Sequence, residues 1–199
     1  MASVLLVCLA SYLLGSIPNG LVFGKLIWHV DLREYGNHNI GATNAWRTLG
    51  KGPGFLIFLL DFLKGALSVG LAEVFAPLPL VMVIAGILAI VGHSCSLFLH
   101  FKGGKGVATG LGVIAMLMPL PSLIVFLVWL AIVMVTKYVS LGSCIAAALV
   151  PILSYAWGYP GAYTAFGVLA AAFIIIRHKA NIVRLMNGTE NKIHAGHRD

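Results

Sequence analysis

Charged residues are scarce in this sequence. Only 10% of its 199 residues are charged, six acidic and thirteen basic, whereas a soluble domain carries about 25%. Hydrophobic residues make up 60% of the chain, and the mean hydropathy is +0.98. These values exclude an ordinary soluble globular domain and predict an all-α protein that crosses a membrane several times. We expect one integral-membrane domain over residues 1–199, because the polar stretches are too short to form a second domain.

Patterns typical of metal sites, disulfide frameworks and secretion signals are also missing. Cys8, Cys95 and Cys144 lie far apart in apolar surroundings without a CxxC motif, as is typical of packing residues. The seven histidines are dispersed and lack metal-ligand spacing, so we expect neither a metal nor a cofactor. No basic segment precedes the first apolar run and no small-residue cleavage site follows it, so we expect no cleavable signal peptide.

Seven apolar runs are the expected membrane segments. Most of them approach the ~20 residues that cross a bilayer core of about 30 Å. One run is shorter and reaches only about 18 Å as a helix, and Pro119 and Pro121 separate it from the next run. The runs comprise residues 3–27, 53–75, 79–99, 107–118 (the short one), 120–136, 139–157 and 161–176.

The basic residues predict the orientation of these segments. A count of seven places every basic residue outside the spans on one side, whereas a count of six divides them between the two sides. Cytoplasmic loops are enriched in lysine and arginine, so we expect the N-terminus outside and the C-terminus in the cytoplasm. The residues on the expected cytoplasmic side are Lys25, Arg33, Arg47, Lys51, Lys102, Lys105, Lys137, Arg177, Lys179, Arg184, Lys192 and Arg198.

Lys64, in the middle of a predicted span, is the one basic residue that this count does not account for. Asp61 stands three residues before it, so the two side chains share a helix face and are expected to pair. A charged pair inside a membrane is a functional hypothesis by default, and a structural pair facing the bundle is the alternative. The sequence leaves both interpretations open.

The first of three long polar stretches is DLREYGNHNIGATNAWRTLGKG, residues 31–52. Its glycines and asparagines favour tight turns with exposed N–H groups. Asn44 and Arg47 are three residues apart, so a short helix would present both on one face. The arginine fork suits a phosphate because it donates two parallel hydrogen bonds. The alternative is a solvated loop with an arginine at the lipid headgroups.

The second polar stretch is FKGGKGVATG, residues 101–110, and His93 lies shortly before it. It is not a nucleotide P-loop, because the GxxxxGK[ST] spacing is missing. Three glycines precede the short apolar run, and the N-terminus of a short helix at the membrane surface directs its free N–H groups toward an anion. The alternative is that the lysines set topology and that Gly106 to Gly110 form a small-residue packing face.

The third polar stretch is RHKANIVRLMNGTENK, residues 177–192. Arg177, Asn181 and Arg184 have the spacing of one stripe on a helix that continues out of the last span. His178 lies beside this stripe. The alternative is a basic amphipathic tail on anionic lipid.

Together these stretches resemble the PlsY family, the bacterial acyl-phosphate:glycerol-3-phosphate acyltransferases, along nearly the whole chain. The resemblance rests on NIGATNAWRTLGK from Asn39, DFLKG from Asp61, GHSCSLFLHFKGGKGVAT from Gly92 and RHKANIVRLMNGTE from Arg177. It implies a multi-pass protein of the bacterial inner membrane whose site faces the cytoplasm. It also implies transfer of a fatty acyl group from acyl phosphate to glycerol 3-phosphate, which gives lysophosphatidic acid and is the first acylation of phospholipid synthesis.

The matching motifs assign roles to residues of all three stretches. The expected catalytic residues are His178, Lys105, Asn181 and His93. The expected substrate- and phosphate-binding residues are Asn37, Asn39, Gly41, Asn44, Arg47, Lys102, Gly103, Gly104, Lys105, Gly106, Thr109, Arg177 and Arg184.

Both substrates are phosphates, and a net charge of +7 would attract them. We expect the amides of the glycine stretch and Lys105 to hold one phosphate, and Arg47 with Lys102 or Arg177 to help hold the other. Acyl phosphate is already activated, so no covalent enzyme intermediate is needed. The acceptor's proton goes either to a histidine or to the donor's own phosphate, which we favour. Apart from these substrates and membrane lipid we expect no partner, no nucleic acid, and a monomer.

One short segment departs from the family pattern. The family has Gly-Ser-Gly-Asn where this chain has Gly36-Asn37-His38-Asn39. An asparagine amide still donates hydrogen bonds in place of the serine hydroxyl. His38 adds bulk, and a titratable ring, where the family has glycine.

Two other classes of function compete with an acyltransferase. An anion or lipid-precursor transporter would show an internal repeat and polar groups at mid-membrane depth, whereas the polar stretches lie at one face. A membrane scaffold would leave the Gly-Lys-Arg-Asn chemistry unexplained. The tail residues 194–199 match the His-x-x-x-x-Asp pattern of other glycerolipid acyltransferases, but a polar terminus offers no pocket and we treat the match as chance.

Overall fold

The computed structural model describes residues 1–194, and all regular elements in that range are helices, which confirms the all-α prediction there. The tail motif of residues 194–199 therefore falls almost wholly outside the described residues. The elements are α1 (Ala2–Ser16), α2 (Asn19–Trp28), α3 (Ala42–Leu49), α4 (Lys51–Phe75), α5 (Pro79–Ser94), η1 (Leu97–Leu99), α6 (Val107–Leu117), α7 (Pro119–Thr136), α8 (Val139–Ala156), α9 (Gly161–Arg177) and α10 (Lys179–Met186).

Each of the seven predicted apolar runs corresponds to a helix or to a pair of helices. The helices α4, α5 with η1, α7 and α8 are long and apolar enough to cross a membrane. The pairs α1–α2 and α9–α10 meet that criterion only as bent spans, with angles of 45° and 61°. Helix α6 is apolar but has only 11 residues, about 16 Å of helix, so it does not cross a full bilayer core.

The two bends correct the sequence expectations of continuous helices. The first apolar run breaks at Ile17 and Pro18, where proline lacks the N–H that a continuous helix needs. The carbonyl of Ile17 accepts hydrogen bonds from the Asn19 amide at 3.1 Å and from Lys64 Nζ at 3.0 Å, so it stays satisfied where the helix is interrupted. The last span ends at His178, so α10 leaves it at an angle and the polar stripe from Arg177 to Arg184 is not straight.

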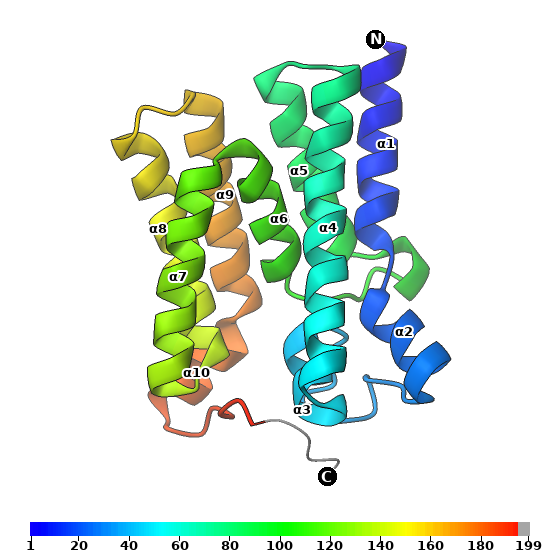
Figure 1. Ribbon diagram of the computed structural model, residues 1–199, viewed down its shortest axis with the longest axis vertical. Coiled ribbons are helices and arrows are strands. Elements are labelled where there is room, and N and C mark those ends of the chain that lie inside the picture. The colour runs from blue at the N-terminus through cyan, green and yellow to red at the C-terminus, as the bar shows by residue number, and fades with distance from the viewer. Residues whose placement is uncertain (195–199) are drawn as a thin grey trace.

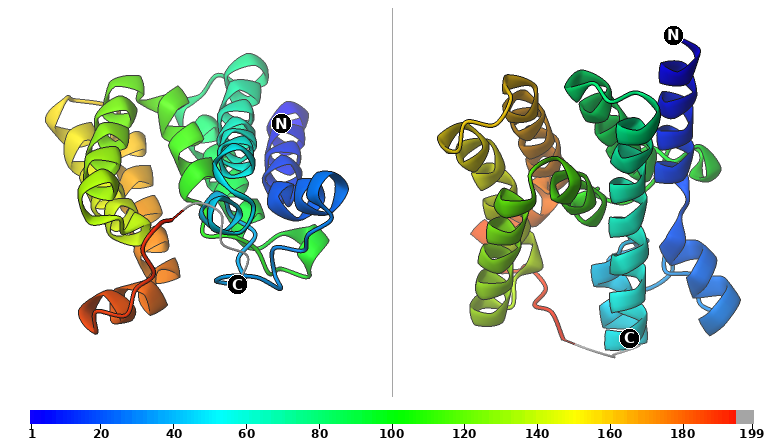
Figure 2. Two further views of the ribbon diagram at one scale, coloured as in Figure 1. Left: turned by 60° about the horizontal axis from the view of Figure 1, so that its bottom comes forward. Right: turned by 45° about the horizontal axis from the view of Figure 1, so that its top comes forward.

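The long helices form two groups with α6 between them (Figure 1). Helix α1 packs on α4 and α5, and helix α8 packs on α7 and α9. Helix α6 packs mainly on α4 and also touches α7, and both views in Figure 2 show it between the groups. Helices α3 and α10 lie together at one end of the molecule (Figure 1), which we call the polar end.

The contact between α4 and α6 depends on glycine. A β-carbon on Gly65 would lie 2.1 Å from the carbonyl oxygen of Thr109, and one on Gly112 would lie 2.0 Å from that of Phe62. The two backbones therefore touch directly, as small residues allow in membrane helix pairs. Thr109 is fully buried in this contact. The two glycines of the packing alternative, Gly106 and Gly110, do not make this contact: a β-carbon on them would lie 3.0 and 3.6 Å from the side chain of Ile90 on α5.

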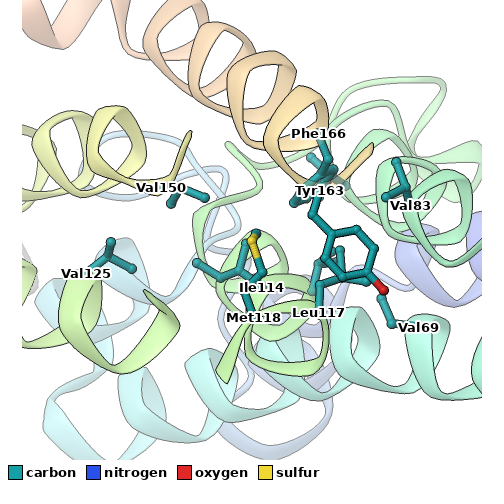
Figure 3. Close-up of a cluster of buried hydrophobic side chains, with 11 residues drawn as sticks. Val69, Val83, Ile114, Leu117, Met118, Val125, Val150, Tyr163 and Phe166 are labelled. Atoms are coloured by element: carbon teal, nitrogen blue, oxygen red, sulfur yellow. The ribbon is translucent and has the colours of Figure 1, made fainter. Parts of the chain in front are cut away.

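An apolar cluster lies between α6 and its neighbours, away from the polar end (Figure 3). Tyr163 and Phe166 of α9 meet Ile114, Leu117 and Met118 at and beyond the last turns of α6. Val69, Val83, Val125 and Val150 bring in α4, α5, α7 and α8. The cluster therefore fills the interior of the bundle on the side away from the polar end. The space between this cluster and the polar end is not filled.

Candidate active site

A cavity of about 160 Å³ occupies that space. Helices α6 and α8 both begin at the polar end, so their first residues line its polar half and later residues such as Ile114 and Val150 line its inner half. The inner half is apolar, with walls from α6, α7, α8 and α9 that include Leu111, Phe126, Trp129, Ala147, Ala170 and Ile174. The polar half is lined by Asn37, Asn39, Arg47, Asp61, His93, Lys105, Ser140, His178, Asn181 and Glu190.

Glu190 organises one side of the polar half, although it is only 8% exposed. Its Oε1 accepts hydrogen bonds from Asn181 Nδ2 at 2.6 Å and from Ser140 Oγ at 2.8 Å. Its Oε2 accepts one from Arg184 Nε at 2.8 Å. The other end of the Asn181 amide accepts from Lys105 Nζ at 2.5 Å. We call these five residues the Glu190 cluster.

The Glu190 cluster fixes the charge states of its members. Burial would raise the pKa of Glu190, but the hydrogen bonds from Asn181, Ser140 and Arg184 outweigh burial and lower it below its usual value. Burial lowers the pKa of Lys105 to about 8; Glu190 opposes this shift, and nearby Arg184 and Arg47 add to it. At pH 7 the cluster thus presents an ionised carboxylate behind a lysine that is still mostly charged.

The first polar stretch builds a compact loop around Asn44, which is 1% exposed. Its Nδ2 donates to the carbonyls of Leu32 and Tyr35, and its Oδ1 accepts from the Asn37 amide. The Asn44 side chain is therefore occupied within the loop, which differs from the phosphate-binding role expected for it. The carbonyl oxygens of Asn37 and Asn39 likewise accept local amides, so these side chains turn the chain at the edge of the cavity.

Arg47 lies on α3, as the predicted short helix required, and it lines the cavity. Its Nη2 donates to the carbonyl of Asn191 at 2.7 Å, which ties α3 to the segment 187–194 after α10. Its Nε is buried without a hydrogen-bond partner among residues 1–194. A buried guanidinium N–H without a partner is costly, so Arg47 has a donor to offer to an anionic ligand.

Asp61 organises the opposite side of the cavity. Its Oδ1 accepts from Lys64 Nζ and from Asn19 Nδ2, both at 3.0 Å, which confirms the predicted pair. His93 Nδ1 lies 3.7 Å from the same oxygen, beyond a hydrogen bond. All four side chains are at most 6% exposed. We call them the Asp61 cluster; Asp61 and His93 line the cavity.

The glycine stretch before α6 rests on His93. The Gly104 amide donates to the carbonyl of His93 at 3.1 Å, and a β-carbon on Gly104 would lie 2.0 Å from His93 Nε2. Arg177 Nη2 donates to the carbonyls of Gly103 and Gly104 at 3.3 and 2.9 Å. The Gly104 amide is thus engaged with the protein rather than directed at a phosphate, contrary to the expectation from sequence.

His178 is 3% exposed and lines the cavity at the bend between α9 and α10. Its Nδ1 lies 2.8 Å from the carbonyl of Ile174. A carbonyl only accepts hydrogen bonds, so Nδ1 carries the proton in the neutral ring and Nε2 is the basic nitrogen. The ring is therefore held in one tautomer.

A polar opening adjoins the cavity and shares Asn37, Asn39, Lys105 and Asn181 with it. The other side chains that line it are those of His38, Arg177, Ala180, Arg184 and Asn191. In residues 1–194, three cations and no carboxylate line this opening. It is therefore suited to an anion.

The structure thus brings most of the expected site residues together. Those that line the cavity or the opening are Asn37, Asn39, Gly41, Asn44, Arg47, His93, Lys105, Gly106, Arg177, His178, Asn181 and Arg184. Four expected residues line neither space: Lys102 is exposed, Gly103 and Gly104 pack on His93, and Thr109 faces α4. The sequence analysis missed Glu190 and Ser140 as site residues; a lone glutamate in a basic tail was the only available signal.

Comparison with known proteins gives consistent matches over nearly the whole chain. The family model described as glycerol-3-phosphate acyltransferase matches residues 5–188. A glycerol-3-phosphate acyltransferase of Syntrophomonas wolfei is 46% identical over 96% of each chain. The crystal structure of PlsY, an integral membrane glycerol 3-phosphate acyltransferase, in its glycerol 3-phosphate form superposes with a TM-score of 0.92, 42% identity and 96% coverage of each chain. Its lysophosphatidic acid form gives 0.90 and 41%, covering 96% of this chain and 95% of that one.

Proposed function

Because the chain belongs to the glycerol-3-phosphate acyltransferase family, we propose that it transfers a fatty acyl group from acyl phosphate to glycerol 3-phosphate. The product is lysophosphatidic acid. The observation that carries the proposal is the two-part cavity. Its inner half is lined by apolar residues of α6, α7, α8 and α9, and its polar half contains the cations Arg47 and Lys105. Such a shape suits a donor with a fatty chain and a phosphate beside a small, water-soluble acceptor.

We propose that the polar end faces the cytoplasm of a bacterial inner membrane and that the enzyme acts as a monomer. Support for the orientation comes from the basic residues, which gather at that end under the positive-inside rule. A monomer is the simplest arrangement, because one chain supplies both the apolar half and the polar half of the cavity. In this arrangement the donor enters from the lipid and the acceptor from the cytosol.

Lys105 and Arg47 are the proposed phosphate ligands inside the cavity. Lys105 follows the glycine stretch and immediately precedes Gly106, the residue that caps α6. Gly106, Val107 and Ala108, at the start of α6, line the same cavity, and a helix N-terminus favours an anion. Arg177 and Arg184 line the opening and are assigned to the phosphate that arrives from water.

The reaction then needs little covalent chemistry from the protein. A hydroxyl oxygen of glycerol 3-phosphate attacks the acyl carbonyl carbon, and the bond from that carbon to the phosphate oxygen breaks. Inorganic phosphate leaves with the electron pair. The proposed acceptor of the hydroxyl proton is the donor's phosphate. The alternative acceptor is the basic Nε2 of His178. The enzyme contributes proximity and cationic stabilisation of the developing negative charge.

The test is an assay of the purified protein in detergent with glycerol 3-phosphate and three separate donors. We expect lysophosphatidic acid from acyl phosphate and none from acyl-CoA or acyl-carrier protein. The Lys105→Met variant is the matched control for a contaminating activity. No product from acyl phosphate would overturn the proposal, and uptake of glycerol 3-phosphate into vesicles without product would favour the transporter class instead.

Histidine variants decide the fate of the proton. A positioned general base typically contributes 10²–10⁴-fold, so His93→Ala and His178→Ala, alone and combined, are measured by kcat. A loss beyond ~10⁴-fold for either single variant would contradict proton transfer to the donor phosphate. We expect a loss smaller than this for each single variant. In the proposed mechanism His93 positions the glycine stretch and His178 lines the polar half of the cavity, and neither accepts the proton.

A further inference from the structure

His38 has an unusual backbone conformation for its position. Its φ is +58°, in the left-handed region that disfavours a β-carbon. His29 and His100 also have positive φ, but they end α2 and η1, where left-handed C-caps are common. His38 caps no helix, so helix termination does not explain its conformation. It stands instead at the edge of the polar opening.

The His38 ring is held by one hydrogen bond. Its Nδ1 lies 2.9 Å from the carbonyl of Arg33. Because a carbonyl only accepts, Nδ1 must be the donor, and Nε2 is the nitrogen left for a ligand. In the neutral ring Nε2 carries only a lone pair, so it forms no hydrogen bond with an ionised phosphate oxygen. In the protonated ring Nε2 offers an N–H, which a phosphate accepts as a charge-assisted hydrogen bond.

The cations that line the opening with His38 are Lys105, Arg177 and Arg184, from the segment before α6, from α9 and from α10. Arg33, on the loop of His38 itself, is paired with Asp31. A bound phosphate dianion favours the protonated ring, because only that ring donates a hydrogen bond from Nε2. Phosphate binding and protonation of His38 are therefore linked.

We propose that His38 is an additional phosphate ligand at the cytoplasmic mouth, which strengthens binding of glycerol 3-phosphate below neutral pH. This inference rests on the proposed function. The shared chemistry is a terminal phosphate group, which glycerol 3-phosphate carries as an ester and the acyl donor carries as a mixed anhydride. The acceptor is the assigned ligand because the opening lies on the polar side, whereas the donor's chain needs the apolar half of the cavity.

The test is equilibrium dialysis of radiolabelled glycerol 3-phosphate with purified protein in detergent, without donor or lipid. His38→Asn keeps a residue type that tolerates positive φ and removes the titratable ring. His29→Asn is the matched control, since His29 has a similar backbone conformation (φ 54°) and lines neither the cavity nor the polar opening. Each variant is compared with the unmodified protein at pH 6.5 and pH 8, so that the titration of Lys105 cancels in the ratio.

For His38→Asn we expect binding weaker by roughly three- to tenfold at pH 6.5 and by less than about twofold at pH 8. For His29→Asn we expect no change at either pH. An equal ratio at both pH values for His38→Asn, or the same pH pattern in His29→Asn, would overturn the inference. The KM for acyl phosphate should not move; a pH-dependent change there would reassign the ligand to the donor. Because binding needs no turnover, a protein that binds but forms no product would refute only the proposed function.

Discussion

The cavity lies between two carboxylate clusters of similar composition and different surroundings. Asp61 and Glu190 are both buried, and each accepts hydrogen bonds from a cation and an amide. The cation of the Asp61 cluster, Lys64, is itself buried and turns toward the backbone of the α1–α2 bend. The cations of the Glu190 cluster, Lys105 and Arg184, line the spaces assigned to substrates. The same chemistry thus stabilises the helix packing around Asp61, whereas around Glu190 it holds the cations that are proposed to bind substrate.

The energetic consequences differ accordingly. A buried pair is weak as a source of stability, but removal of one partner strands the other charge and costs several kcal/mol. That cost is expected in full at Asp61, whose partners cannot reach water. At Glu190, Arg184 is 41% exposed and can be solvated when the carboxylate is lost. We therefore expect damage to the Asp61 cluster to appear mainly in stability and damage to the Glu190 cluster mainly in activity.

The largest effect is expected from Asp61→Leu. The substitution leaves Lys64 buried without its counter-ion, so we expect a loss of about 3–5 kcal/mol in unfolding free energy. Thermal unfolding in detergent is the measurement. The double variant Asp61→Leu/Lys64→Met removes both charges and should recover most of the loss. A single variant that unfolds at the temperature of the unmodified protein would contradict a structural role for this cluster.

The next effect is expected from Glu190→Gln. The new side chain has one acceptor oxygen and an N–H₂ group, so either Asn181 with Ser140 or Arg184 loses its acceptor, and in both orientations the negative charge behind Lys105 is lost. We expect kcat/KM for glycerol 3-phosphate to fall roughly 10- to 100-fold, since a hydrogen bond to a charged group contributes about 1.5–3 kcal/mol. The unfolding temperature should change much less than for Asp61→Leu. If stability collapsed instead and activity per folded molecule were kept, the contrast between the clusters would be lost.

A pH profile sharpens the contrast further. The pKa of Lys105 is lowered to about 8, so this lysine is charged below that pH and neutral above it. We expect kcat/KM for glycerol 3-phosphate to decline about tenfold between pH 7.5 and 9.5 as the charge is lost, because this parameter reports the free enzyme. Lys105→Arg keeps its charge in this range, and its profile should stay flat. A decline that persists in Lys105→Arg would assign it to another group.

The smallest effect is expected from Ser140→Ala. The substitution removes one of two hydrogen bonds to Glu190 Oε1 and leaves those from Asn181 and Arg184 in place. We expect a loss of about 0.5–1.5 kcal/mol in unfolding free energy and only a several-fold change in kcat/KM. A loss as large as that of Glu190→Gln would show that Ser140, not Asn181, transmits the effect of the carboxylate.

The two clusters also differ in how far the sequence predicts them. Asp61 and Lys64 are three residues apart inside one apolar run, so helical geometry alone places them together. Glu190 lies 9 residues from Asn181 and 50 from Ser140, and its contacts arise only when the chain turns back after α10. No periodicity predicts such a return. The run 3–27 was predicted to be continuous although Pro18 lies at the first bend, and the apolar pattern contains no proline at the second bend, at His178.

Residue spacing likewise predicted the location of site residues better than their tasks. Asn44 and Arg47 lie on the expected short helix, yet Asn44 holds the loop and Arg47 faces the cavity. The glycine stretch precedes α6 as expected, but its Gly104 amide bonds to His93 because α5 ends directly beneath it. A linear pattern reports which residues are available near one another. Which hydrogen bonds they form depends on neighbours brought in by tertiary packing.

The segment 187–194 has a consequence for the biogenesis of this enzyme. It carries Glu190 into the site, gives the Asn191 carbonyl to Arg47, and donates the Ile193 amide to the carbonyl of Lys137. Chains emerge from the ribosome in order, and their earlier parts fold first. Every span is therefore synthesised before the residues that complete the polar half of the cavity. A nascent chain with its spans already inserted would be a bundle without a finished active site, so we expect acyl transfer only after residues 187–194 have been synthesised and have left the ribosome.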